Sequence, residues 1–328
     1  MQIIAGTKEL SRALTRPVLT IGNFDGVHLG HRAIMNTVIE RARLLGGESV
    51  VLTFDPHPRK VLQPDRAPSL LATREQKLEA LEAIGIDVVI LQPFDLEFAS
   101  TSPEEFVREI VYERIRPAEV FVGYDFHFGR DREGSMAALS EIGAGLGFSV
   151  TIIPEIRIDD GDVNSTRIRK LLAEGEVEEA GVLLGRPFSV RSVVLEGERR
   201  GRTLGFPTAN LSPENEILPA VGVYAGEIRV IADDAVNFKT NDIKTRNIET
   251  DKRYPAVINV GHRPTFHENG HLLAEAHLLD FEGDLYGLAV ELSFCHRLRS
   301  EQKFPGPEEL KAQIAADIAT ARKRLRSR

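Results

Sequence analysis

Two histidines and three glycines follow the first long apolar run of the chain. His28 and His31 lie three residues apart, among Gly22, Gly26 and Gly30. These glycines let the backbone turn tightly and approach a ligand, and the helical pattern that opens here presents unpaired N–H groups and a positive dipole end, which favour phosphate. An isolated H-x-x-H is more often a metal pair or two hydrogen-bonded loop histidines. The glycine-rich helix start instead favours a phosphate site, in which both histidines donate hydrogen bonds as charge builds in a transition state.

A second helix start lies at Asn164–Arg169. Ser165 is a good N-cap for the helix that follows, and capping alone would explain it. Arg169 is less expected, because the helix dipole disfavours a cation near a helix start, and a bound phosphate would reverse that penalty. The two helix starts together predict a site for one polyphosphate.

The second half of the chain contains the sequence PTAN. Thr208 and Asn210 are two residues apart, so on a strand they would share one face. A hydroxyl and an amide oxygen there suit Mg²⁺, which prefers oxygen ligands together with substrate phosphates. The chain contains no G-x-x-x-x-G-K-[ST] sequence. The lead-in to PTAN is predicted to be flexible and basic, or simply a solvated loop; it contains Gly197, Arg199, Arg200, Gly201, Arg202 and Gly205.

A carboxylate and a histidine occur further on, in Glu275-Ala276-His277. Both side chains would lie on one face of a strand with apolar neighbours. A carboxylate on such a wall can accept a proton from an attacking hydroxyl. Taken alone, Glu275 is more simply an ordinary solvent-facing strand residue.

Strand and helix patterns alternate through the first half of the chain. Thr73–Gln76 has capping-box spacing, Ser102–Glu105 adds a proline at the first helical position, and a helix from His31 is predicted to end near Gly46. Strands separated by helices predict a doubly wound parallel sheet, which binds ligands beyond the carboxyl ends of its strands. The predicted strands are Val18–Gly22, Ser49–Phe54, Asp87–Leu91, Glu119–Gly123 and Ser149–Ile153.

The pattern changes after a short acidic helix at Val177–Leu184. Strand-like runs punctuated by Gly and Pro predict an all-β barrel or sandwich, followed by a terminal helix at Pro307–Arg326. We expect two domains, 1–184 and 185–328. Residues 233–252 are polar and are predicted to form a long exposed hairpin loop. The runs are Ser189–Leu195, Val223–Ile231, Ala256–Val260, Leu272–Phe281 and Leu288–Phe294.

Composition limits the classes of function. The chain has 328 residues, which suggests about two domains, and a net charge of −8, which disfavours nucleic acid as the main partner. It has no apolar run that could span a membrane and no evident secretory signal. Cys295 is the single cysteine, so no internal disulfide forms, and we expect a cytoplasmic location.

The motifs of the first half resemble the H-x-G-H nucleotidyltransferase superfamily. GNFDGVHLGH, TFDPHP, GYDFHFG and STRIR are together similar to the FMN adenylyltransferase module of prokaryotic bifunctional FAD synthetases. The resemblance implies that His28 and His31 contact ATP phosphates and that Ser165, Thr166 and Arg169 close over them, with His28, His31 and Arg169 catalytic. It also implies ATP contacts at Gly22, Phe24 and Asp25, where Asp25 orients either a metal or the loop, and a flavin pocket formed by Phe54, Pro56, Pro58, Asp125, Phe126 and Phe128. Core packing is the alternative role for these aromatic residues.

The second half resembles the riboflavin kinase family. The similar segments are GRPFSVRSVVLEGERRGRTLGFPTANL, GVYAG, YPAVINVGHRPTF, EAHLLDFEGDLYG and LRSEQKF. The resemblance implies a six-stranded barrel followed by a helix, Mg–ATP at Thr208 and Asn210 with Gly201 nearby, Glu275 as the base for the riboflavin 5′-hydroxyl, and Arg299 near flavin and phosphate. The chain departs from the family at the insertion around residues 233–252 and at Asn164, where the family frequently has serine.

These observations predict an enzyme with two sites. The C-terminal domain would phosphorylate riboflavin to FMN with ATP, and the N-terminal domain would adenylylate FMN to FAD with release of pyrophosphate, both with Mg²⁺. The alternative is a nucleotidyltransferase for another acceptor, with a barrel that only binds flavin. We expect small-molecule partners, no nucleic acid or membrane partner, and a monomer or weak homo-oligomer.

Overall fold

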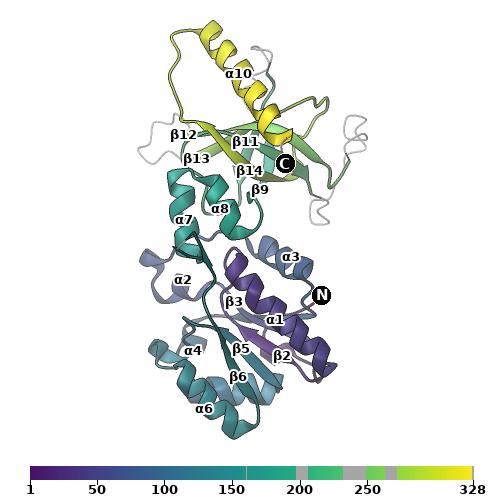
Figure 1. Cartoon of the computed structure of the whole chain (residues 1–328), viewed down its shortest axis with the longest axis vertical. Coiled ribbons are helices and arrows are strands. Elements are labelled where there is room, and N and C mark those ends of the chain that lie inside the picture. The colour runs from purple at the N-terminus through teal and green to yellow at the C-terminus, as the bar shows by residue number, and fades with distance from the viewer. Residues whose placement is uncertain (160, 197–205, 232–248, 263–271, 327–328) are drawn as a thin grey trace. The chain divides into compact units, whose positions relative to one another are not determined.

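The computed structural model describes residues 1–159, 161–196, 206–231, 249–262 and 272–326 (Figure 1). Within it the chain forms two compact units, Met1–Ser165 and Thr166–Arg328. In the described residues, no helix is both long enough and apolar enough to cross a bilayer.

A six-stranded sheet forms the centre of the first unit. All its strand pairs are parallel, and the strand order is β1-β4-β3-β2-β5-β6. The predicted doubly wound parallel sheet is therefore confirmed. The order reverses where β2 lies between β3 and β5, and in open sheets of this kind ligands bind beyond the carboxyl ends of the strands at such a point. The strands are β1 (Gln2–Ile4), β2 (Val18–Ile21), β3 (Ser49–Asp55), β4 (Val88–Pro93), β5 (Glu119–Gly123) and β6 (Ser149–Ile153).

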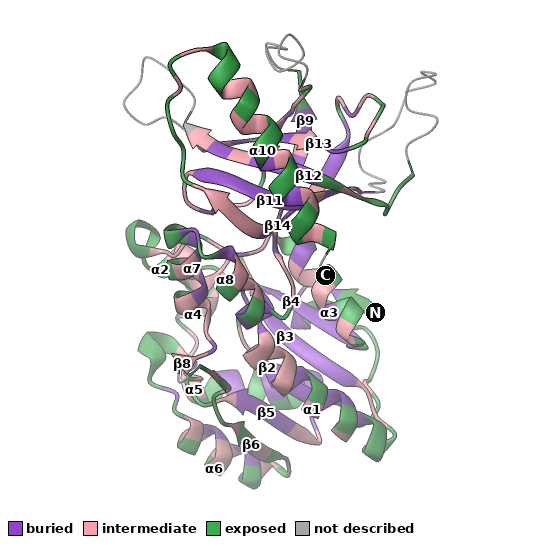
Figure 2. Cartoon of the chain, turned by 45° about the horizontal axis from the view of Figure 1, so that its top comes forward, coloured by how far each residue is buried: buried purple, intermediate pink, exposed green. Residues whose placement is uncertain are grey.

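Helices cover both faces of this sheet, and its central strands β2, β3, β4 and β5 are largely buried (Figure 2). Successive strand residues point to opposite faces. Thus Leu52 joins a core with Val107, while its neighbour Val51 joins another with Met35 and Leu81. The main helices are α1 (Leu29–Leu45), α3 (Arg74–Ile84), α5 (Pro103–Glu105), the π-helical η3 (Phe106–Ile115) and α6 (Met136–Leu146).

Most of the predicted helix boundaries are confirmed. Thr73 and Gln76 form a reciprocal capping box at the start of α3, and Ser102 and Glu105 form another at α5. Gly46 ends α1 in the left-handed conformation, with a φ of 61°. Short elements complete the unit: η1 (Thr7–Glu9), α2 (Pro58–Leu62), η2 (Pro64–Arg66), α4 (Leu96–Ala99), η4 (Arg130–Arg132), β7 (Arg157–Ile158) and β8 (Gly161–Asp162).

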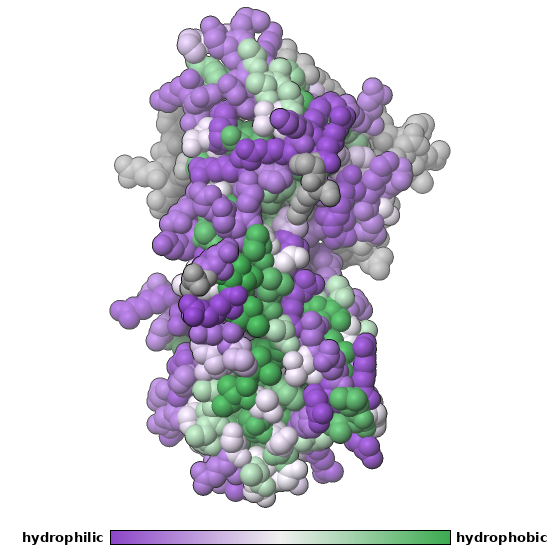
Figure 3. All heavy atoms as spheres, viewed as in Figure 1, coloured by the Kyte–Doolittle hydropathy of each residue, from purple (hydrophilic) through white to green (hydrophobic). Residues whose placement is uncertain are grey.

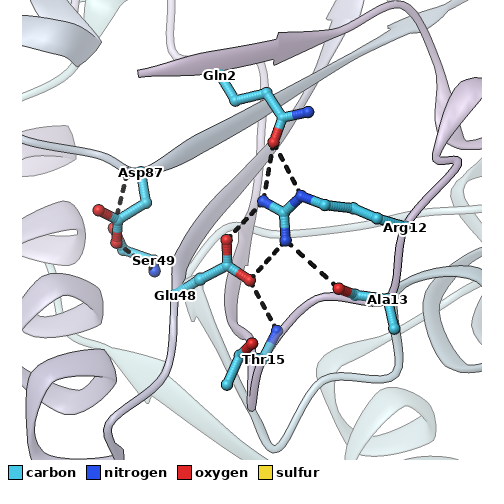
Figure 4. Close-up of polar contacts among 7 residues, drawn as sticks. All are labelled: Gln2, Arg12, Ala13, Thr15, Glu48, Ser49 and Asp87. Atoms are coloured by element: carbon cyan, nitrogen blue, oxygen red, sulfur yellow. Dashed lines mark hydrogen bonds and ion pairs between the residues drawn. The ribbon is translucent and has the colours of Figure 1, made fainter.

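The edge strand β1 was missed by the sequence prediction, because three residues are too few to show alternation. A polar network supports it (Figure 4). The guanidinium of Arg12 donates to the Gln2 side chain at 2.8 Å and to the Glu48 carboxylate at 2.6 Å. Ser49 donates its backbone N–H and its hydroxyl to the Asp87 carboxylate at 2.8 and 2.7 Å. These bonds connect β1, β3 and β4 near their amino ends, away from the edge where ligands are expected.

The second unit is built around a closed antiparallel barrel with strand order β10-β13-β12-β11-β14-β9. This confirms the six-stranded barrel implied by the family resemblance and excludes the sandwich. The terminal helix α10 (Pro307–Arg326) has the predicted bounds and packs Ala321 against Val223 and Val257. The strands are β9 (Phe188–Leu195), β10 (Ala209–Pro213), β11 (Gly222–Val230), β12 (Arg253–His262), β13 (Leu272–Leu278) and β14 (Ala289–Arg299).

Two helices precede the barrel, α7 (Ser165–Glu174) and α8 (Val177–Leu184). They contact the barrel unit, because Leu172 accepts a hydrogen bond from Ala220 N and the Glu178 carboxylate accepts one from Arg297 N. The domain boundary between residues 184 and 185 stays a prediction. Most of the expected 233–252 loop lies outside the described residues; its flanking strands β11 and β12 are antiparallel neighbours.

Hydrophobic side chains reach the surface of both units. Figure 3 shows more hydrophobic surface on the visible face of the first unit than on that of the barrel unit. Large exposed hydrophobic residues of the first unit include Ile3, Leu44, Leu62, Leu96 and Ile152. Singly exposed residues of this type are normal for folded proteins, so they carry no functional argument.

The barrel leaves no space for a side chain at Gly226 of β11. A Cβ atom there would lie 2.0 Å from Ser293 O and 2.4 Å from Ile258 Cδ1. We therefore expect Gly226→Ala to destabilise the barrel by about 2 kcal/mol, in the range of overpacked core positions. At Gly261 of β12, a Cβ would make only ordinary contacts, the nearest at 3.5 Å. Denaturant unfolding of Gly226→Ala and the matched Gly261→Ala tests this; equal midpoints would contradict it.

Candidate functional site

The turn from β2 into α1 has an unusual backbone. Phe24, Gly26 and Val27 have φ values of 50°, 79° and 42°, in the left-handed region that glycine tolerates and other residues avoid. Phe24 and Val27 are buried, and a Cβ at Gly22 would lie 2.9 Å from the Phe24 ring. Gly22 therefore provides the space for Phe24. Strain of this kind persists where the surrounding structure enforces it, and it is common at ligand sites.

The structure brings His28 and His31 together, as predicted. Their rings stack with centroids 3.5 Å apart. His28 is the N-cap of α1, and its Nδ1 accepts a hydrogen bond from the His31 backbone N–H at 3.4 Å. The His31 Nδ1 atom is buried and, among the described residues, makes no hydrogen bond. This ring atom therefore has no hydrogen-bond partner in the described part of the chain, at a helix start where anions bind well.

Electrostatics favour the neutral form of His31. Burial lowers its pKa well below the ordinary value, and the charges of His28 and Lys77 act in the same direction. Two stacked imidazoles beside an ammonium cannot all be charged at low cost. A bound anion would reverse this balance, because an opposite charge nearby favours the protonated ring.

Asp25 contacts the segment that precedes α3. Its buried carboxylate accepts hydrogen bonds from Leu71 N at 3.0 Å and Ala72 N at 3.3 Å. These bonds fix the segment before α3 against the glycine-rich turn. Of the two roles considered from the sequence, metal or loop orientation, they support the loop.

Ser165 does not act as the predicted N-cap. Helix α7 begins at Ser165 itself, and the Ser165 hydroxyl donates to the carbonyl oxygen of Asp25 at 3.0 Å. The hydroxyl therefore joins the helix start to the glycine-rich turn. Thr166 and Arg169 belong to the second compact unit, so their predicted contact with ATP stays a prediction.

An aromatic cluster lies at the carboxyl ends of β3, β4 and β5. It includes Phe54 and Phe128 from the predicted flavin pocket, and the ring of Phe126 stacks on Phe128 with centroids 5.6 Å apart. Three members were missed by the sequence prediction, because nothing in their local pattern separates them from core residues. These are Phe94, Phe98 and Phe106, linked to the others by ring contacts of 5.5 to 6.3 Å.

The remaining predicted flavin-pocket residues of this unit are two prolines and one aspartate. Pro56 follows β3 and is exposed, and Pro58 starts α2. Asp125 is exposed in the segment after β5. Lys77 of α3 was also missed: its ammonium lies 3.2 Å from Thr53 Oγ1 at the end of β3.

A polar row crosses the barrel. Glu275 of β13 pairs directly with Asn210 of β10 on one side and with Asn259 of β12 on the other. Directly opposed residues point to the same face of a sheet. The alternate residues Ala274 and Ala276 are buried, so the row lies on the outer face. Asn259 was not predicted, because an asparagine within a strand gives no signal until its cross-strand partner is known.

The PTAN segment is held next to this row. The Nδ1 atom of His277 lies 2.8 Å from Pro207 O, and its ring makes an edge contact with Phe206. Thr208 is partly buried and precedes β10, which starts at Ala209. The shared-face argument assumed that Thr208 lies on the strand, but it lies just before the strand, two residues from Asn210 in the chain. The predicted contact residue Gly201 lies outside the described residues.

Arg299, at the end of β14, is held by α10. Its guanidinium donates to the Asp317 carboxylate at 2.9 Å, and both side chains are largely buried. It also lies over the Phe304 ring. The position near flavin and phosphate stays a prediction, and the ion pair with Asp317 holds the Arg299 guanidinium at the end of β14.

Comparison with known proteins agrees with this two-unit organisation. A family model described as FAD synthetase matches residues 10–167, and one described as riboflavin kinase matches residues 184–325. The chain is 38% identical over 322 residues to the bifunctional riboflavin kinase/FMN adenylyltransferase of Pseudomonas fluorescens, which covers 98% of this chain and 97% of that protein. The bifunctional enzyme of Bacillus subtilis is 35% identical and covers 92% of this chain and 90% of that protein.

A solved structure has the same fold over the whole chain. It is described as a macrolide-efflux protein from Streptococcus pneumoniae, with a TM-score of 0.83, 29% identity and 98% of each chain covered. The two matched families, FAD synthetase and riboflavin kinase, define a class of two-unit enzymes of flavin cofactor biosynthesis. The chain belongs to the bifunctional riboflavin kinase/FMN adenylyltransferase family.

The electrostatics of His31 can be measured directly. We expect His31 to titrate well below the ordinary histidine pKa of about 6.5, because burial and the charges of His28 and Lys77 oppose its protonation. A nonhydrolysable ATP analogue should raise that pKa. Proton NMR over a pH series, with His31→Gln to assign the signal, gives both values.

The same shift predicts a pH-dependent stability. Below pH about 6.5 the unfolded chain binds a proton at His31 that the folded chain does not, so stability falls as pH decreases. The free energy of unfolding of wild type should therefore fall relative to that of His31→Gln as the pH is lowered. A His31 signal that titrates at the ordinary pKa would contradict both expectations.

Proposed function

We propose that the barrel unit phosphorylates riboflavin to FMN and that the first unit adenylylates FMN to FAD, with ATP as the donor in both steps. The observation that supports this most directly is the stacked pair His28 and His31 at the start of α1. We assign phosphate binding to both rings, which follow β2 at the same sheet edge as the aromatic cluster. A flat apolar ring system and a polyphosphate would then meet in one place.

Adenylyl transfer needs no nucleophile from the protein. An oxygen of the FMN phosphate attacks the α-phosphorus of ATP, and the bond from that phosphorus to the bridging oxygen breaks as pyrophosphate leaves. The protein contributes alignment and positive charge. The proposed ATP-binding residues of this site are Gly22, Phe24, Asp25, His28, His31, Ser165, Thr166 and Arg169, and the proposed flavin-binding residues are Phe54, Pro56, Pro58, Asp125, Phe126 and Phe128.

Phosphoryl transfer to riboflavin needs a base at the 5′-hydroxyl. We assign that role to Glu275, whose carboxylate is exposed in the centre of the polar row. The hydroxyl oxygen attacks the γ-phosphorus of ATP while Glu275 accepts its proton, and ADP leaves. Arg299 is proposed to contact the flavin or phosphate, and Asp317 keeps its guanidinium in place.

The proposal includes Mg²⁺ beside Thr208 and Asn210. Their hydroxyl and amide oxygens, next to Glu275, are the oxygen donors that Mg²⁺ prefers. Among the described residues, no group of three or more His, Cys, Asp and Glu side chains could hold a metal ion. Mg²⁺ commonly keeps waters and substrate phosphates as its other ligands. When bound, the ion would neutralise charge on the ATP phosphates.

The rival, a nucleotidyltransferase for another acceptor with a barrel that only binds flavin, is not favoured. A binding barrel needs neither a carboxylate nor the PTAN oxygens, and this barrel has Asn210 and Glu275 as direct cross-strand neighbours. A cytoplasmic location, small-molecule partners alone and a monomeric or weakly oligomeric state remain part of the proposal.

The two sites are proposed to act independently. His31→Ala should abolish FAD formation while FMN still accumulates, because it removes a phosphate-binding ring from the first unit only. The full chain is incubated with riboflavin, ATP and Mg²⁺, and flavins are separated by chromatography over time. Loss of FMN together with FAD would argue against independent sites, and absence of both products in wild type would refute the proposed function.

The base is tested in the barrel. Glu275→Gln keeps the side-chain shape but removes the proton acceptor, so riboflavin phosphorylation should fall by about 10² or more. FAD should still form from supplied FMN. Glu282→Gln, at an exposed position after β13, is the matched control. The base assignment is falsified if Glu275→Gln keeps near-wild-type kinase turnover.

A further inference from the structure

Lys77 is a partly buried cation at the candidate adenylylation site. Its Nζ donates to Thr53 Oγ1 at 3.2 Å and lies 3.4 Å from the carbonyl oxygen of Phe54. Both acceptors are neutral. Within the described residues, Lys77 has no ion pair with a carboxylate inside 4.0 Å, whereas Arg74, one turn earlier on α3, contacts Asp55 at 3.5 Å.

Such a cation is costly without an anion. Burial lowers the pKa of Lys77, although the charges of Asp55 and Asp25 partly oppose this. A bound anion in hydrogen-bond range would stabilise the charged form and make a charge-assisted hydrogen bond with it. Buried charges are normally paired, so the present arrangement indicates a site for an anionic ligand.

The position of Lys77 indicates which anion it would bind, the phosphate of the flavin acceptor or the phosphates of ATP. Thr53, which accepts from Lys77, in turn donates to Asn23 O in the glycine-rich turn at 3.2 Å. Phe54, its other acceptor, begins the aromatic cluster through contacts with Phe94 and Phe98. The ammonium therefore lies between the turn that carries the histidines and the rings that suit a flavin. In adenylyl transfer, the acceptor phosphate occupies that intermediate position.

We infer that the Lys77 ammonium binds the phosphate of FMN and holds it for attack on the α-phosphorus of ATP. This rests on the proposed adenylylation. The step balances without proton transfer: the FMN phosphate oxygen forms the new P–O bond, the bond between the α-phosphorus and the bridging oxygen breaks, and pyrophosphate carries away its charge. Lys77 neutralises the attacking dianion and sets its direction, while the histidine pair contacts the donor phosphates.

The alternative is that Lys77 only braces the end of β3. Two substitutions separate these roles. Lys77→Met keeps the length and packing of the stem and removes the charge, and Lys77→Arg keeps the charge. Lys8→Met, at an exposed position of η1, is the matched control.

The experiment measures initial rates of FAD formation from FMN and ATP with the full-length chain. Lys77→Met should raise KM for FMN by about tenfold or more, the loss of one charge-assisted hydrogen bond, while KM for ATP stays near wild type. Lys77→Arg should recover much of the loss, and Lys8→Met should behave as wild type. Because the proposed kinase site lies in the other unit, thermal unfolding of each variant, followed by circular dichroism and compared with wild type, reports whether the first unit is folded.

A second readout excludes a bracing role. 5′-Deoxyriboflavin has the flavin ring but cannot be phosphorylated, so it should inhibit FAD formation equally in wild type and Lys77→Met. If Lys77→Met weakens FMN binding and inhibition by this analogue to the same extent, the inference is overturned in favour of a purely structural role. A rise in KM for ATP alone would assign the anion to ATP, and no change would remove Lys77 from the site. If wild type forms no FAD, the proposed function fails instead.

Discussion

The candidate adenylylation site depends on one strained turn. Between β2 and α1, Phe24, Gly26 and Val27 all adopt left-handed backbone, at a cost of order 1–3 kcal/mol for each residue other than glycine. Burial of the Phe24 and Val27 side chains and the hydrogen bonds of Asp25 to the segment before α3 offset this cost. Because the turn has this conformation, His28 lies at the N-cap of α1. His31 is then stacked on it one turn later, so the histidine pair is a product of the turn.

The barrel site has a different origin. No residue of its polar row adopts a strained backbone; the row exists because antiparallel register places Asn210 and Asn259 on either side of Glu275. A shift of one residue in either pairing would turn these side chains into the barrel core. Close approach at Gly226 and the packing of α10 help to maintain that register. The candidate kinase site therefore depends on barrel closure, which is why the barrel stability test bears on the proposed function.

The sequence predicted what local patterns encode. The capping boxes at Thr73 and Ser102, the bounds of α10 and most strands follow from signals within a few residues. Arrangements that depend on distant partners were not predictable: β1 needs Arg12 and β4, and the cross-strand position of Asn259 needs β13. The Ser165 hydroxyl serves the turn at Asp25 instead of its own helix, and no spacing rule reveals that choice.

Charge connects these points. The net charge of −8 disfavours anionic partners in general, yet the histidine pair and Lys77 form a local positive site. Burial and the charges of His28 and Lys77 lower the pKa of His31, and burial lowers that of Lys77. A bound polyphosphate would oppose both shifts, because an opposite charge nearby favours the charged form of each group. The candidate site thus carries its positive groups where two phosphates would approach each other, and each bound phosphate would lower the cost of a charged Lys77 or His31.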